Sequence, residues 1–159
     1  MNYRRLFPCV LLLLSSCVVL AYSGQTSVAV LSPMELVQGT AAPADFIQAE
    51  QLKARLSRNE RLILLDVRDT SSFVGSSNKI KGAFHVKLRR LNYRLSLPPL
   101  RDISRDSEVV TYCACPNDEA SIRAARILSD SGFKHVYVLK GGWRMWLKVN
   151  GPVEPRPRA

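Results

Sequence analysis

The sequence contains little histidine and little cysteine: two and four residues, respectively, in a chain of 159. Cys9 and Cys17 fall in an N-terminal segment, so only Cys113 and Cys115 remain in the rest of the chain. Two cysteines separated by one residue cannot build the disulfide framework of a small secreted domain. Their spacing also matches no standard zinc arrangement. We therefore interpret both histidines as ordinary surface or strand residues and expect no metal site.

The sequence also lacks internal repeats and any long block of lysine and arginine, although its formal net charge is +10. The basic residues are scattered, and the densest stretch contains Lys87, Arg89, Arg90 and Arg94. Our main interpretation of this stretch is a solvated basic helix face. The alternative is a surface that attracts an anionic membrane or an anionic substrate. Because no recognised nucleic-acid reader motif is present, we do not expect a nucleic-acid partner.

The first 24 residues have the pattern of an export signal. Arg4 and Arg5 precede a short apolar stretch, residues 6–14, and Leu14-Ser15-Ser16-Cys17 resembles a lipobox whose cysteine is lipidated. Cleavage near residues 21–23 and an uncleaved membrane anchor are the alternatives. In all three cases we expect an exported domain in the periplasm or cell envelope. The lipidated cysteine and the uncleaved segment would also anchor the chain to a membrane through its N-terminus.

The remaining chain divides into a linker at 25–44, one domain at 45–154 and a disordered tail at 155–159. The linker is rich in Ser, Thr, Gly, Pro and Ala, and the tail is rich in proline. Within the domain, apolar periodicity predicts helices at 49–56, 88–95, 118–131 and 143–149, and strands at 62–67, 80–86, 109–113 and 135–139. This alternation predicts an α/β fold with a mainly parallel sheet.

Cys113 stands at the end of the predicted strand 109–113, just before a loop and a helix. In parallel sheets, ligands bind where strands end and helices begin. Loop amides and the free N–H groups of the helix can converge on the sulfur there and favour a thiolate. The alternative is a buried cysteine that acts only as a small apolar residue. A bond between Cys113 and Cys115 would close a small, strained ring, so we expect it to be easily reduced.

Four motifs follow one another along the domain: Leu64-Leu65-Asp66-Val67-Arg68, Lys79-Ile80-Lys81-Gly82-Ala83, Tyr112-Cys113, and Leu139-Lys140-Gly141-Gly142-Trp143 with Trp146 and Pro152-Val153-Glu154. In this order they resemble the motifs of the rhodanese family of sulfurtransferases. The loop itself resembles a Cys-x-Cys-Pro-Asn variant of some bacterial members. The resemblance covers about residues 46–154 and implies a rhodanese-like fold, with helices on both faces of the sheet.

The resemblance also implies a mechanism without a metal or organic cofactor. Cys113 would take a sulfur from a donor, hold it as a persulfide and pass it to a thiol or cyanide acceptor. The family pattern assigns the persulfide-cradling loop to Ala114, Cys115, Pro116, Asn117 and Asp118, and supporting roles to Asp66, Arg68, Lys140, Gly141 and Gly142.

The loop departs from thiosulfate-using relatives because it contains no Arg or Lys and ends in Asp118 and Glu119. We therefore expect thiosulfate to be a poor physiological donor, unless Lys140 or Arg123 supplies the missing positive charge. Related phosphatases need an arginine where this chain has Glu119, which argues against phosphate-ester chemistry.

Three functions remain open on the sequence. The first is one-cysteine sulfur transfer through Cys113. The second is thiol-redox chemistry, in which Cys115 attacks the Cys113 persulfide and releases sulfide, although Cys115 could equally be a packing residue. The third is a non-catalytic binding module, which the presence of Cys113 disfavours because inactive members usually lack this cysteine.

Overall fold

The computed structural model describes residues 45–157. The predicted export signal, the linker and the lipidation site at Cys17 lie outside this range. Within it, no helix combines the length and the apolar character needed to cross a membrane. The described residues also hold no cluster of three or more His, Cys, Asp or Glu that could bind a metal ion.

Within residues 45–157, seven strands and five α-helices follow one another. The strands are β1 Asp45–Ile47, β2 Ile63–Asp66, β3 Asn78–Ile80, β4 Phe84–His85, β5 Glu108–Tyr112, β6 His135–Leu139 and β7 Val153–Pro155. The helices are α1 Ala49–Ser57, α2 Thr70–Val74, α3 Leu91–Leu95, α4 Glu119–Asp130 and α5 Gly142–Lys148, with 3₁₀ turns η2 Leu88–Arg90 and η3 Leu100–Asp102.

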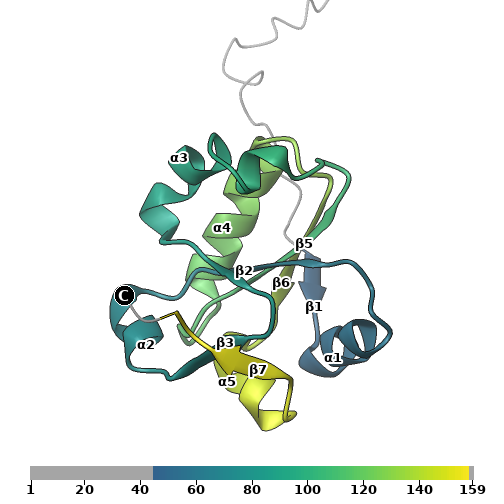
Figure 1. Ribbon diagram of the computed structural model, residues 1–159, viewed down its shortest axis with the longest axis vertical. Coiled ribbons are helices and arrows are strands. Elements are labelled where there is room, and N and C mark those ends of the chain that lie inside the picture. Colours follow the sequence, from purple (N-terminus) through teal and green to yellow (C-terminus); the bar gives the residue numbers. More distant parts are fainter. Residues whose placement is uncertain (1–44, 158–159) are drawn as a thin grey trace, which may run out of the picture. The chain divides into compact units, whose positions relative to one another are not determined.

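The central sheet has five strands in the order β1-β6-β5-β2-β4, and all its neighbouring strands are parallel (Figure 1). Strands β3 and β7 form a separate antiparallel pair. The predicted α/β fold with a parallel sheet is confirmed. Its central strand β5 lies between β2 and β6, so the loop after β5 emerges from the middle of the carboxyl edge.

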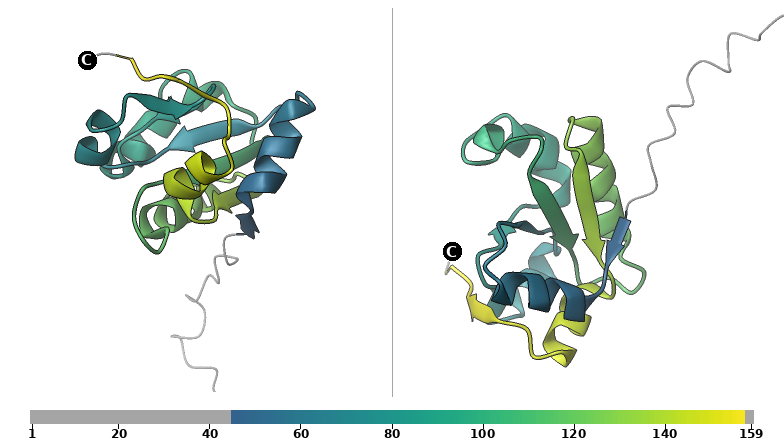
Figure 2. Two further views of the ribbon diagram at one scale, coloured as in Figure 1. Left: turned by 90° about the horizontal axis from the view of Figure 1, so that it is seen from below. Right: turned by 90° about the vertical axis from the view of Figure 1, so that its right-hand side faces the viewer.

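Alternation along β5 divides the core into two clusters, one on each face of the sheet. Val109 and Cys113 belong to the cluster that includes side chains of α3 and α4. Val110 and Tyr112 belong to the cluster that includes side chains of α1 and α5. Successive side chains of a strand point to opposite faces, so helices cover both faces as expected. Figure 2 shows these helices around the sheet in two further views.

Two strands differ from the sequence expectation. The predicted strand 80–86 is divided by a turn, in which Gly82 has a positive φ of 79°, so that β3 and β4 join different sheets. Strand β1 was missed, because it is three residues long and only Ile47 is buried. A short edge strand with one buried side chain carries too little alternation to be recognised.

Residues 155–159 are the tail that the sequence predicts to be disordered, and the first two of them are hydrogen-bonded or paired in the structure. Val153–Pro155 forms β7 and pairs with β3, and the backbone N–H of Arg156 donates to Ser77 at 3.0 Å. The indole N–H of Trp146 donates to the carbonyl of Pro152 at 3.1 Å. Proline is compatible with an edge strand, where its missing N–H breaks no central ladder. Proline content alone therefore did not identify disorder here.

Candidate active site

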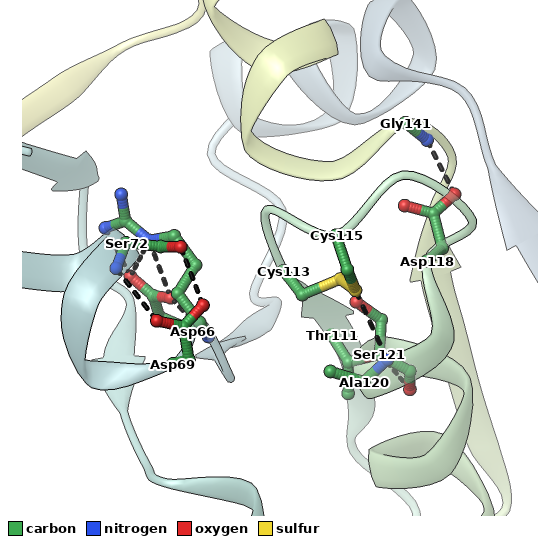
Figure 3. Close-up of a disulfide and its surroundings, with 11 residues drawn as sticks. Asp66, Asp69, Ser72, Thr111, Cys113, Cys115, Asp118, Ala120, Ser121 and Gly141 are labelled. Atoms are coloured by element: carbon green, nitrogen blue, oxygen red, sulfur yellow. Dashed lines mark hydrogen bonds and ion pairs between the residues drawn. A yellow bond between two sulfur atoms is a disulfide. The ribbon is translucent and has the colours of Figure 1, made fainter.

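Cys113 is the first residue after β5, and its side chain is 1% exposed. The structure joins it to Cys115 in a disulfide (Figure 3), with 5.8 Å between the two Cα atoms. Cys115 is partly exposed, and Ala114, Pro116 and Asn117 of the same loop are exposed. The loop thus presents a buried sulfur and a more accessible one, bonded together.

Two hydrogen bonds fasten the loop to the turn between β6 and α5. The carbonyl of Cys113 accepts from the backbone N–H of Trp143 at 2.8 Å. At the other end of the loop, Oδ2 of Asp118 accepts from the backbone N–H of Gly141 at 2.8 Å. Gly142 has a φ of 48°, and a Cβ there would lie 2.2 Å from the Cys113 carbonyl oxygen. Only glycine permits this close approach.

The start of helix α4 differs from the expected arrangement around Cys113. The N–H of Ala120, in the first turn, donates to Sγ of Cys115 at 3.4 Å. In the disulfide form this amide therefore faces Cys115, and the expected convergence of amides on a Cys113 thiolate or persulfide stays a prediction. Asp118 precedes the helix with a left-handed φ of 54°, and its carboxylate turns toward Gly141 instead of capping α4. Sulfur accepts from a helix amide that lacks an intrahelical partner.

On the other face of the sheet, Asp66 and Arg68 form a fully buried ion pair. Nη2 and Nε of Arg68 lie 2.6 Å and 2.9 Å from the carboxylate oxygens of Asp66. The hydroxyl of Tyr112 donates to the same carboxylate at 2.8 Å. The Arg68 guanidinium also lies 4.4 Å from the centre of the Trp143 ring. This network contacts Trp143, whose backbone N–H donates to the carbonyl of Cys113, so one residue links the network to the cysteine loop.

The charges in this network follow from its contacts. Burial alone would raise the pKa of Asp66, but the nearby His85 ring, whose Nδ1 lies 3.9 Å from Oδ1, and the hydrogen-bonded guanidinium of Arg68 outweigh burial and hold that pKa below its ordinary value. Burial, together with the charge of Asp66, raises the pKa of Tyr112 above its usual range. Asp66 is therefore a carboxylate and Tyr112 a neutral hydroxyl donor at neutral pH.

A pocket of about 640 Å³ opens over both cysteines. Its wall includes three basic residues, Lys87, Arg89 and Arg123, and two acidic ones, Asp69 and Glu119. Arg68 borders the pocket as well, with its guanidinium turned toward Trp143. Lys140 is exposed and is not among the lining residues. Of the two residues proposed to supply a compensating charge, the structure places Arg123 in the pocket wall and Lys140 outside it.

Sequence reasoning missed Lys87 and Arg89 as residues of the site. Both belong to the basic stretch whose main interpretation was a solvated helix face, and Arg89 is indeed exposed. The turn η2, Leu88–Arg90, brings this stretch to the pocket. The feature of the sequence that could have indicated them is the density of basic residues in this stretch, which we alternatively interpreted as a surface for an anionic substrate. Sequence alone could not choose between the two, because the choice depends on contacts between distant segments.

Comparisons with known proteins agree on one family. The sequence model of the family described as "Rhodanese-like domain" matches residues 48–149. The chain is 31% identical over 99 residues to the thiosulfate sulfurtransferase GlpE of Glaesserella parasuis, covering 62% of this chain and 83% of that protein. It is 27% identical over 107 residues to a sulfurtransferase of Allochromatium vinosum, covering 67% of this chain and 92% of that protein. The crystal structure of the Alr3790 protein from Anabaena aligns with a TM-score of 0.59 at 32% identity, covering 69% of this chain and 82% of that one.

Proposed function

The chain belongs to the rhodanese-like domain family, and we propose that it is a sulfurtransferase that carries sulfane sulfur as a persulfide on Cys113. The observation that carries this proposal is the position of Cys113. It lies at the carboxyl end of the central strand β5 and lines a pocket that also contains Cys115. Ligands of parallel sheets bind at this edge.

The proposed reaction begins with reduction of the Cys113–Cys115 disulfide by a thiol. The Cys113 thiolate then attacks the outer sulfur of the donor, and the rest of the donor leaves with the bonding electron pair, as sulfite when the donor is thiosulfate. A thiol or cyanide acceptor next attacks the outer sulfur of the persulfide, and Cys113 leaves as a thiolate. The initial reduction consumes two thiols, which leave as a disulfide; the two transfer steps then need only the protein, the donor and the acceptor, and no cofactor.

The charge around the pocket supports an anionic sulfur donor. The loop itself lacks lysine and arginine, but Lys87, Arg89 and Arg123 reach the pocket from η2 and α4. Positive charge around a cleft raises the local concentration of an anion. The acidic Asp69 and Glu119 oppose this effect only in part. The argument against thiosulfate from the loop sequence is therefore weaker than the sequence alone suggested, and the curated relative from Glaesserella parasuis is named for that activity.

The proposed location is outside the cytoplasm, on the strength of the N-terminal sequence, with Cys17 as the site of a lipid anchor. Fractionation of cells that express the full chain would test it, with Cys17→Ser as the comparison. Retention of the wild-type chain in membranes and release of the variant would agree with lipidation, whereas cytoplasmic wild-type chain would contradict export.

The test of the proposed activity is sulfur transfer by the full chain after reduction and removal of the reductant. Thiosulfate with cyanide, and a low-molecular-weight persulfide with a thiol, serve as two donor–acceptor pairs. We expect transfer by the wild type and complete loss in Cys113→Ser. If the wild type transfers sulfur from neither donor, the enzyme proposal fails and a binding module becomes the better account. Undiminished activity in Cys113→Ser would also contradict it.

A further inference from the structure

We propose that Cys115 is a resolving thiol, which attacks the sulfur-loaded Cys113 and releases the carried sulfur as hydrosulfide. This inference rests on the proposed function, because it needs the persulfide on Cys113. Its product is the Cys113–Cys115 disulfide that the structure contains. The domain then has two outlets for its sulfur: transfer to an external acceptor, and reductive release within the loop.

The loop holds the two cysteines at a separation that suits this attack. Their Cα atoms are 5.8 Å apart, within the range that disulfides require. The bonds from Trp143 to the Cys113 carbonyl and from Gly141 to Asp118 fix both ends of the loop. A further bond, from the N–H of Asp118 to the carbonyl of Cys115 at 3.5 Å, closes the turn after Cys115. No large rearrangement of the fastened ends is needed to bring the sulfurs together.

The hydrogen bond from helix α4 indicates which sulfur would be stabilised as a thiolate once the disulfide is opened. The Ala120 N–H reaches Cys115 Sγ at 3.4 Å, and α4 is 12 residues long. An amide at a helix N-terminus stabilises an anion, so it favours Cys115 as an attacking thiolate and as the leaving thiolate when the disulfide is reduced. Asp118 leaves this amide free, because its carboxylate binds Gly141. The sulfur that accepts this hydrogen bond is also the one bonded to Cys113, which supports a chemical role for the amide.

The proposed step balances in atoms and electrons. The Cys115 thiol loses its proton, and its sulfur attacks Sγ of Cys113. The new Sγ–Sγ bond forms as the bond between Cys113 Sγ and the outer sulfur breaks. The outer sulfur leaves with the electron pair and gains a proton, giving hydrosulfide. Two electrons pass from the cysteines to the sulfane sulfur. A second turnover requires an external thiol–disulfide reductant, so this outlet must be coupled to a supply of dithiol or of two thiols.

A single-turnover experiment tests the resolving role. The full chain carries Cys9→Ser and Cys17→Ser, so that Cys113 and Cys115 are its only thiols. It is reduced, freed of reductant and mixed with thiosulfate, with no acceptor. Intact mass and released sulfide are then measured. In this background we expect one sulfide per protein and a loss of two hydrogens. The matched variant Cys115→Ser should gain one sulfur atom, retain it and release no sulfide.

The other outcomes separate this inference from the proposed function. If the protein with both cysteines holds the extra sulfur as stably as Cys115→Ser does, the resolving role is overturned while the persulfide proposal stands. If neither protein gains sulfur or releases sulfide, from thiosulfate or from a low-molecular-weight persulfide, both proposals fail. Sulfur uptake by Cys115→Ser also shows that this variant is folded, so its lack of sulfide release cannot be assigned to misfolding.

Discussion

Tyr112 and Cys113, consecutive residues at the end of β5, point to opposite faces of the sheet. Tyr112 points into a buried network with Asp66 and Arg68, in which a carboxylate, a guanidinium and a hydroxyl satisfy one another. Cys113 points to the other face and lines a pocket. There, basic side chains on the wall are available to an incoming molecule. One strand end therefore supplies both a rigid support and a reactive group.

The difference shows how the fold separates stability from chemistry. The buried side contains polar groups that bind one another and aromatic rings packed against the Arg68 guanidinium. The pocket side contains two sulfurs and charges that complement an anion. Trp143 connects the sides, because its ring contacts Arg68 and its backbone holds Cys113. Substitutions on the buried side should mainly lower the free energy of unfolding, and substitutions on the pocket side should mainly lower the rate of sulfur transfer.

The largest expected effect comes from breaking the buried pair. Arg68→Ala leaves Asp66 as an uncompensated buried charge, and we expect a loss of roughly 3–5 kcal/mol in the free energy of unfolding. Urea denaturation measures it. The double variant Asp66→Ala/Arg68→Ala should lose less than the sum of the two single losses, because the residues are coupled. Strict additivity would show that the network is not a unit.

The second-largest effect should come from disturbing the contact between Gly142 and the Cys113 carbonyl. Gly142→Ala forces a left-handed φ on alanine, which costs about 1–3 kcal/mol by itself, and places Cβ against the Cys113 carbonyl. We expect a greater loss of stability than from strain alone, together with reduced sulfur transfer. Gly82→Ala is the matched control, since Gly82 also has a positive φ but a Cβ there would meet nothing within 4 Å. Equal effects of the two variants on transfer would contradict a specific role for Gly142.

Low pH should decrease the stability of the folded protein through protonation of Asp66. The pKa of Asp66 is lower in the folded protein than its ordinary value, so its stabilising effect is fully present above that ordinary value, about 3.9. The effect is lost as pH falls from there through the folded pKa, because the unfolded chain binds the proton more readily. The pH dependence of the melting temperature below pH 4 should be steeper for the wild type than for Asp66→Asn. Identical slopes would exclude Asp66 as a contributor.

The smallest expected effect concerns the pocket wall. Arg123→Gln removes a positive charge beside the cysteines, and we expect kcat/KM for thiosulfate to fall by about tenfold or less, with less dependence on salt. Arg126→Gln is the control, because Arg126 lies on the same helix and is not among the pocket residues. Equal losses in both variants would indicate a general charge effect and not a donor site.

The fold was largely predictable because apolar runs and turns mark buried strands and helices independently of distant contacts. The runs around Leu64, Val110 and Val138 each became a central strand. Strand β1 and the pairing of Val153 with Ile80 were not predictable, since both depend on a partner elsewhere in the chain. Short edge elements have too few buried side chains to define a period.

The candidate site was predictable in its centre and, apart from Arg123, not in its wall. The position after a buried strand pointed to Cys113 and the short spacing pointed to Cys115, and the structure places both at the pocket. The placement of Lys87 and Arg89 in the wall, and of Lys140 outside it, required the folded arrangement of η2 and α4. The direction of the Ala120 amide toward Cys115 also depends on loop geometry, which Asp118 sets through Gly141.

The most direct test of the central claim, that sulfur passes through Cys113, is to locate the carried atom. Reduced Cys115→Ser protein is incubated with thiosulfate, alkylated, digested and analysed by peptide mass spectrometry. The account predicts one additional sulfur on the peptide that contains Cys113 and none on peptides that contain other cysteines. Additional sulfur on another cysteine, or unmodified Cys113 after exposure to both thiosulfate and a low-molecular-weight persulfide, would contradict it.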